Sequence, residues 1–163
     1  MKAVVQRVRK TTLSVDGKLI SEIEKGFAVY FGVKRGDTKD KADYLAKKIA
    51  GLRVFEDENG KMNLALKDVG GEILLISQFT LLADVSHGNR PGFTDAEDPA
   101  TANEMYLYMA DCLRGYGIPV KTGVFGADMK IQQFNDGPVT ILYDICTKGK
   151  REIYGSRSGD ITI

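Results

Sequence analysis

The stretch EILLISQFTLL, residues 72–82, is the most apolar strand candidate in the 163-residue chain. Its length and its isoleucine and phenylalanine content favour a buried β-strand. Alternation along that strand places Ser77 and Phe79 on one face and Gln78 and Thr80 on the other. A buried glutamine or threonine needs hydrogen-bond partners. Satisfied core side chains and a functional strand end therefore explain these polar residues equally well.

Most segments on either side of this stretch also have strand character. Alternating apolar residues, or short apolar runs between turn residues, predict them. The expected strands lie at residues 1–10, 13–15, 18–23, 26–33, 52–55, 62–66, 118–121, 130–134 and 139–146. Helical spacing of apolar residues predicts two helices, one over 38–50 and one from Asp98-Pro99 to about Arg114. The expected apolar stripe of the first is Ala42, Leu45, Ala46 and Ile49, and that of the second is Ala102, Met105, Tyr106, Met109, Cys112 and Leu113. This order argues against regular βα alternation, so we expect an α+β fold with a mainly antiparallel or mixed, barrel-like sheet and two principal helices.

Composition limits the chemistry. Lys plus Arg number 23 and Asp plus Glu number 22, so the net charge is +1. That balance argues against a dispersed nucleic-acid coat but leaves room for a local basic site. One His and two Cys cannot form a closed structural zinc site. We expect no metal and no cofactor, and chemistry that comes from hydroxyls, amides, carboxylates, the backbone or the substrate.

The chain length fits one domain, which we place at residues 1–146. Residues 147–163, TKGKREIYGSRSGDITI, form a basic extension with four cations and two acids. This extension is either a peripheral segment or an extra contact for a polyanion. The N-terminal residues have no signal-peptide core, and no apolar run is long enough to span a bilayer. We therefore expect a cytoplasmic protein that is not membrane-bound. Cys112 and Cys146 form no CxxC motif and are expected to be buried and reduced.

A second polar segment, NDGPVT, occupies residues 135–140. Asn-Asp-Gly is typical of a turn, and Gly137 allows another backbone to approach closely. Pro138 lacks an N–H and is expected to begin the last strand. Physical chemistry alone favours an ordinary turn here. The single histidine, His87, lies in a loop rich in Gly, Asn and Pro, where a solvated side chain is the simplest interpretation.

With these segments assembled, the sequence resembles the D-aminoacyl-tRNA deacylases of the bacterial and eukaryotic cytosolic type, the D-tyrosyl-tRNA deacylase family. The resemblance covers residues 1–146. The matching segments are MKAVVQRV at 1–8, DYLA at 43–46, LRVF at 52–55, GKMN at 60–63, SQFTL at 77–81, FGADM at 125–129 and NDGPVT at 135–140.

The resemblance implies a homodimer whose substrate is the 3′ end of an aminoacyl-tRNA. Ester hydrolysis would release free D-amino acid and tRNA, a proofreading step in translation. Ser77, Gln78, Phe79 and Thr80 would line the floor of the pocket. A cis Gly137-Pro138 pair from one subunit would enter the pocket of the other.

The Gly137-Pro138 pair that the resemblance implies suggests how the enzyme would distinguish D- from L-aminoacyl groups. The Gly137 carbonyl and the Pro138 ring would clash with the Cβ of an L-residue, and that clash supplies the discrimination. The same wedge would reject glycine poorly, so mischarged glycyl-tRNA is a further expected substrate.

Two catalytic routes stay open. Thr80 could act as a nucleophile, but the sequence shows no general base to activate it. In the favoured route, backbone N–H groups near Phe79 and Thr80 hold the carbonyl oxygen, and a ribose hydroxyl of the substrate helps a water to attack. An alternative function is a non-catalytic nucleic-acid-binding module that uses the basic extension and a lysine-bearing helix face.

Overall fold

The computed structural model describes residues 1–145, which form eight strands, two α-helices and two short 3₁₀ helices. The expected extension, residues 147–163, and Cys146 lie outside the described residues. The elements in chain order are β1 (Lys2–Val15), β2 (Lys18–Ile23), β3 (Gly26–Gly32), α1 (Lys39–Ala50), β4 (Arg53–Glu56), β5 (Met62–Ala65), η1 (Leu66–Val69), β6 (Glu72–Ser77), η2 (Phe79–Leu82), α2 (Pro99–Gly115), β7 (Val120–Thr122) and β8 (Met129–Asp144).

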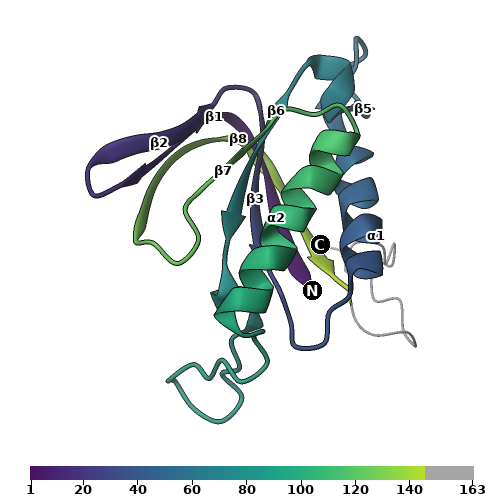
Figure 1. The fold of residues 1–163 in the computed structure, drawn as a ribbon. Coiled ribbons are helices and arrows are strands. Elements are labelled where there is room, and N and C mark those ends of the chain that lie inside the picture. Colours follow the sequence, from purple (N-terminus) through teal and green to yellow (C-terminus); the bar gives the residue numbers. More distant parts are fainter. Residues whose placement is uncertain (146–163) are drawn as a thin grey trace, which may run out of the picture.

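One mixed sheet organises the molecule (Figure 1). Its strand order is β2-β1-β3-β6-β7, and β8 also pairs with β1. The β1 strand is antiparallel to β2, β3 and β8, whereas β3–β6 and β6–β7 are parallel pairs. The long β1 strand thus serves both halves of the sheet, with β3 beside its first half and β2 beside its second half. The expected α+β fold with a mixed, barrel-like sheet and two helices is confirmed.

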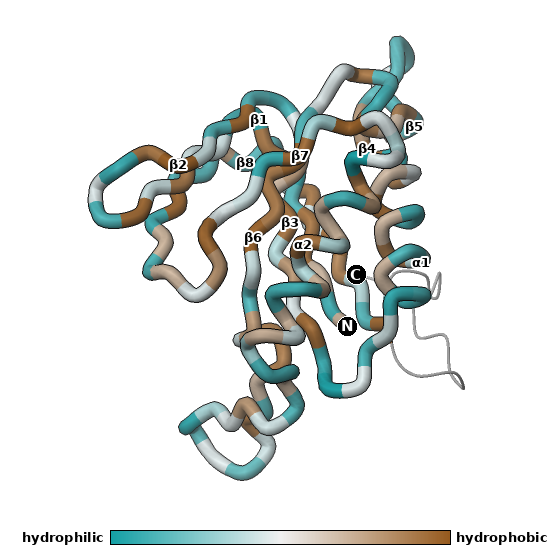
Figure 2. Tube along the Cα trace, viewed as in Figure 1, coloured by the Kyte–Doolittle hydropathy of each residue, from teal (hydrophilic) through white to brown (hydrophobic). Residues whose placement is uncertain are grey.

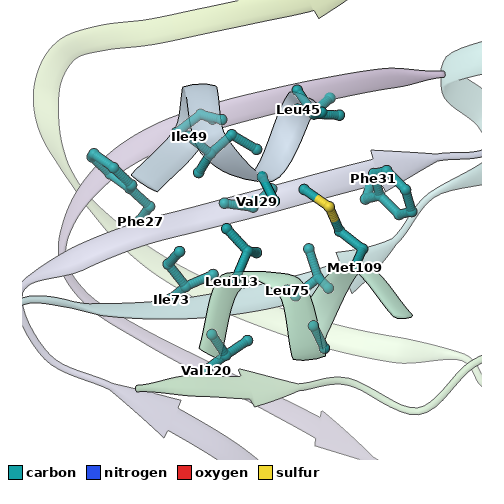
Figure 3. Packing of buried hydrophobic residues seen from close by; sticks show 14 of the residues in the cluster. Phe27, Val29, Phe31, Leu45, Ile49, Ile73, Leu75, Met109, Leu113 and Val120 are labelled. Carbon is teal, nitrogen blue, oxygen red and sulfur yellow. The ribbon is translucent and has the colours of Figure 1, made fainter. Parts of the chain in front are cut away.

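Both helices lie against one face of this sheet (Figure 1). The predicted apolar stripe of α1, namely Ala42, Leu45, Ala46 and Ile49, is fully buried. It packs with α2, β3 and β6 in the main core (Figure 3). Hydropathy follows this arrangement, because apolar residues run along β3 and β6 while the outward side of α1 is polar (Figure 2). No helix within residues 1–145 is both long and apolar enough to cross a membrane.

Three local expectations are wrong, each because a tertiary contact overrides local propensity. Residues 2–15 form one strand rather than two, because Thr11 and Thr12 pair with both β2 and β8. The strand expected over 72–82 ends at Ser77, and residues 79–82 form a 3₁₀ helix. The reason is that its parallel partner β3 ends at Gly32, so the ladder stops, and the 3₁₀ turn instead buries Leu82 in the core. Phe79 and Thr80 therefore do not alternate on the faces of a strand.

The third wrong expectation concerns residues 135–140. They form no turn, and Pro138 does not begin a strand, because β8 runs unbroken from Met129 to Asp144. The ladder with β1 pairs Gln6 with Thr140 and Val8 with Asn135. Arg7 therefore stands alone opposite residues 136–139, which form a bulge. Residue types that favour a turn thus lie within a continuous strand.

Candidate active site

The predicted pocket floor, residues 77–80, lies where two parallel strands end. Ser77 is the last residue of β6 and pairs with Phe31 of β3. The Gln78 N–H donates to the Phe31 carbonyl at 2.8 Å as the last rung of this ladder, and the chain then enters the 3₁₀ helix of residues 79–82. Carboxyl ends of parallel strands are where open sheets bind ligands. The sequence thus folds so that these four residues border open space.

A cavity of about 280 Å³ opens at this strand end. Its walls come from the ends of β3 and β6, from α2 and from the loop before β8. They are formed by Phe31, Val33, Ile76, Ser77, Gln78, Phe79, Glu97, Ala102, Tyr106, Phe125, Gly126, Ala127, Asp128, Met129 and Ile131. One cavity therefore brings together three of the four predicted floor residues and residues 125–129, the FGADM segment of the family resemblance.

Thr80 stands beside this cavity rather than in its wall. Its hydroxyl accepts a hydrogen bond from the Gln78 side-chain amide. The neighbouring Phe79 is 58% exposed and packs edge-on against Phe93, with ring centroids 4.9 Å apart. An amide donor holds the Thr80 hydroxyl in place but cannot take its proton.

Tyr106 is a wall residue that sequence reasoning assigned only to the core stripe of α2. Its hydroxyl donates to the Leu75 carbonyl at 2.7 Å and accepts from the Gly123 N–H at 3.1 Å. Burial raises the pKa of Tyr106 to about 12. The signal in the sequence was a tyrosine within an apolar stripe, because a buried phenol needs a partner. Tyr106 ties β6 to the segment that leads into the cavity wall.

Gly137 and Pro138 are exposed on β8, and neither is among the residues that line the cavity of the same protomer. Their peptide bond is cis. A Cβ built on Gly137 would meet only the Val139 nitrogen, at an ordinary 3.7 Å. The protomer itself therefore leaves room for a side chain at this position.

Arg7 supports the bulge that carries these two residues, a role the sequence did not reveal. Its side chain is 8% exposed, and its Nε donates to the Asp136 carbonyl at 2.9 Å. Its Nη1 donates to the Val54 carbonyl, and its Nε also lies 3.3 Å from the Asp136 carboxylate. Arg9 reaches the same carboxylate from solvent, at 3.2 Å and with 69% of its side chain exposed.

Other polar residues have structural roles. Asp98 caps α2 by accepting from the Ala100 and Thr101 N–H groups at 3.1 and 3.2 Å. The hydrogen bond from the Lys61 N–H is the main cause that lowers the pKa of Asp57 in its turn. His87 is exposed in its loop, as expected. In residues 1–145, no group of three or more His, Cys, Asp and Glu side chains could hold a metal ion.

One further expectation is corrected here. Cys112 is only partly buried, and its thiol donates to the Asp43 carboxylate at 3.2 Å. The Tyr108 hydroxyl donates to the same oxygen at 2.7 Å. The cysteine is thus part of a polar contact between α1 and α2 rather than a buried apolar residue.

Comparison with known proteins gives one consistent result. A family model described as D-Tyr-tRNA(Tyr) deacylase matches residues 4–144. The D-aminoacyl-tRNA deacylase of Fervidobacterium nodosum is 51% identical over 144 residues, covering 88% of this chain and 97% of that protein. The protein of the same name from Persephonella marina is 54% identical over the same shares of the two chains.

Solved structures agree on the fold. The c-Myc DNA Unwinding Element Binding Protein superposes with a TM-score of 0.84 and 40% identity, covering 90% of this chain and 100% of that one. A probable eukaryotic D-amino acid tRNA deacylase superposes with a TM-score of 0.74 and 18% identity, covering 88% and 98%. The latter likeness concerns the fold alone. The family match and the identities of about one half over nearly whole relatives establish that the chain belongs to the D-Tyr-tRNA(Tyr) deacylase family.

Proposed function

We propose that this protein hydrolyses the ester bond of D-aminoacyl-tRNA, releasing free D-amino acid and tRNA, and so edits mischarged tRNA in the cytoplasm. The observation that carries the proposal is the identity of about one half to curated D-aminoacyl-tRNA deacylases, over 97% of their length. The segments 77–81 and 135–140, which carry the resemblance, are intact in the sequence. The cavity at the strand end supplies a place for the aminoacyl group.

The wall chemistry of the cavity suits such a substrate. Phe31, Ile76 and Phe125 contribute apolar surface, while Ser77 and Gln78 supply hydrogen-bonding groups at one side. Sites for small ligands are mostly apolar with a few placed polar groups that fix orientation. An apolar wall accepts many amino-acid side chains, because removing a methylene changes binding by only about 1–3 kcal/mol. Selection between hands must then come from another group.

A second copy of the chain is the proposed source of that group. Gly137 and Pro138 are exposed, and nothing in their own protomer fills the space beside Gly137. No contact within the protomer requires a glycine at this position, so the close approach of another molecule explains it. We infer that the protein is a homodimer in which the Gly137-Pro138 segment of each subunit enters the cavity of the other. The Arg7 contacts hold the bulge in the shape that this docking needs.

The docked segment would select by exclusion. The Gly137 carbonyl and the Pro138 ring would stand where the Cβ of an L-residue would lie, leaving space for hydrogen and for a D-side chain. Such a site rejects the wrong substrate through repulsion rather than through stronger contacts to the right one. Glycyl-tRNA lacks a Cβ on either side and is therefore an expected further substrate.

For the chemical step we favour assistance by the substrate. The Gln78 amide next to the Thr80 hydroxyl is not a base. Backbone N–H groups near Phe79 and Thr80 would hold the ester carbonyl oxygen as negative charge develops. A water oxygen then bonds to the carbonyl carbon, the ester C–O bond breaks, and the ribose oxygen leaves as a hydroxyl. The adjacent ribose hydroxyl relays the proton.

The test compares two glycine variants with the wild type. A Cβ at Gly115, at the end of α2, meets nothing within 4 Å, and one at Gly137 meets only a 3.7 Å contact. Gly115→Ala and Gly137→Ala should therefore both fold with wild-type stability. We expect Gly115→Ala to release D-amino acid and glycine from charged tRNA like the wild type, and to stay dimeric by light scattering.

Gly137→Ala should lose activity by about 10²-fold, the effect of misplacing a reacting group by about 1 Å. A wild type that releases neither D-amino acid nor glycine would refute the proposed function. A monomeric wild type with full activity, or a fully active Gly137→Ala, would refute the contribution of the second subunit.

A further inference from the structure

A chain of hydrogen-bonded side chains, the amide network, crosses three strands of the sheet beside the bulge of β8. The Tyr30 hydroxyl of β3 donates to the Gln133 side-chain carbonyl of β8 at 3.2 Å. The Gln133 amide donates to the Gln6 side-chain carbonyl of β1 at 2.7 Å and to the Asn135 side-chain carbonyl. The Gln6 amide in turn donates to the Thr140 hydroxyl at 3.4 Å. No step of the proposed reaction uses these side chains.

The amide network joins the two ends of the bulge. In the ladder with β1, Asn135 is the last paired residue before the bulge and Thr140 is the first paired residue after it. Residues 136–139 between them have no partner in that ladder. Because the network bonds to both end residues, it fixes where the bulge leaves the ladder and where it returns.

Arg7 and the amide network hold the bulge from opposite faces of the sheet. Gln6 and Arg7 are consecutive residues of β1, so their side chains point to opposite faces. Arg7 lies on the buried face and donates to the carbonyl of Asp136, the first residue of the bulge. Gln6 is half-buried and donates to Thr140, beyond the last residue of the bulge. The network therefore stops the bulge from pivoting about its contact with Arg7.

Gln133 is the centre of the amide network. Its carbonyl accepts one hydrogen bond and its amide donates two, so its polar groups match those of its partners. Burial raises the pKa of Tyr30, which keeps the Tyr30 hydroxyl protonated and able to donate. A network of satisfied side chains makes the residues that it joins more rigid.

We propose that Gln6 and Gln133 are positioning residues, which hold the Gly137-Pro138 segment in the orientation that excludes L-aminoacyl groups. This role rests on the proposed function, in which that segment selects by exclusion. Selection by a clash needs a rigid segment, since a displacement of about 1 Å changes a rate by about 10²-fold. Loss of either amide leaves the Arg7 contacts in place, so the bulge persists but is held less firmly. The discrimination between D and L should then weaken.

The experiment measures kcat/KM for D- and L-forms of the same aminoacyl-tRNA, with the wild type, Gln6→Met and Gln133→Met. Methionine keeps the length of glutamine and removes its amide. We expect the D-to-L ratio of kcat/KM to fall by about tenfold or more in each variant. A merely structural role would lower both values together and leave the ratio unchanged. Gln132→Met, at an exposed position of the same strand outside the network, is the matched control and should keep the wild-type ratio.

Two further measurements separate the inference from the proposed function. The double variant Gln6→Met/Gln133→Met should lower the ratio by less than the product of the two single effects, because both substitutions break the same hydrogen bond. Amide hydrogen exchange of residues 135–140 needs no substrate, and it should be faster by about tenfold or more in Gln133→Met but unchanged in Gln132→Met.

An unchanged D-to-L ratio in both single variants, or unchanged exchange of residues 135–140 in Gln133→Met, would overturn the inference. A wild type that deacylates no charged tRNA, together with faster exchange in Gln133→Met, would refute the proposed function and uphold the support of the bulge by the amide network.

Discussion

Removing the Arg7 guanidinium should weaken both the fold and the editing reaction. Arg7→Met keeps the aliphatic part of the side chain, which packs in the sheet. It removes the hydrogen bonds to the Asp136 and Val54 carbonyls and the ion pair to the Asp136 carboxylate. The bulge at residues 136–139 then loses the side chain that stands opposite it.

The magnitude follows from these contacts. A hydrogen bond to a charged group contributes about 1.5–3 kcal/mol, and breaking a buried ion pair costs about 3–5 kcal/mol. Because the Asp136 side chain is 27% exposed, water offsets part of the loss. We expect Arg7→Met to lower the free energy of unfolding by about 3–5 kcal/mol. Arg7→Lys should lose about 1.5–3 kcal/mol, since one ammonium cannot reproduce the fork of the guanidinium.

Arg9→Met is the internal control. Arg9 meets the same Asp136 carboxylate, but its side chain is 69% exposed, so its loss should cost about 0–1 kcal/mol. Urea unfolding at an unchanged m-value measures all three variants. Deacylation of D- and L-aminoacyl-tRNA measures the consequence for the site. The reasoning fails if Arg7→Met matches Arg9→Met in stability, or if it retains wild-type activity.

Three further outcomes are expected. Thr80→Ala should keep kcat/KM within about tenfold of the wild type, whereas a loss of about 10³-fold or more with the fold intact would favour a nucleophile. Removing residues 147–163 should leave deacylation unchanged, as expected if residues 1–146 form the deacylase domain. Loss of function would favour the nucleic-acid-binding alternative. Tyr106 has a folded pKa of about 12, above its unfolded value near 10, so its stabilisation is complete below pH 10 and disappears as the pH rises toward 12. Between pH 10 and pH 12, the free energy of unfolding of Tyr106→Phe should therefore fall by about 2–3 kcal/mol less than that of the wild type. Urea titrations at each pH measure this difference.

Local pattern predicted the parts of the fold that local forces decide. The α1 stripe was correct because helical spacing and burial coincide at Leu45 and Ile49. The core of β6 was correct because four consecutive buried residues suit a strand covered on both faces. Its end was wrong because the length of β3, a different segment, determines where the ladder stops. Residues 135–140 were wrong for the same kind of reason, since Arg7 stabilises a bulge where turn chemistry predicts a turn.

The candidate site shows the same division. The polar residues within the apolar run left a core role and a site role equally open, and only the family resemblance implied Ser77, Gln78 and Phe79 as pocket residues. All three line the cavity. Tyr106 could not be separated from an ordinary core residue, because its partners, Leu75 and Gly123, are distant in sequence.

The separation of the cavity from the Gly137-Pro138 segment has a genetic consequence under the proposed dimer. Each chain would carry half of its own site and half of its neighbour's. A substitution near residue 137 of one subunit would then impair the cavity of the other subunit, although the walls of that cavity are unchanged. Selection on these two segments would act on pairs of molecules rather than on single chains.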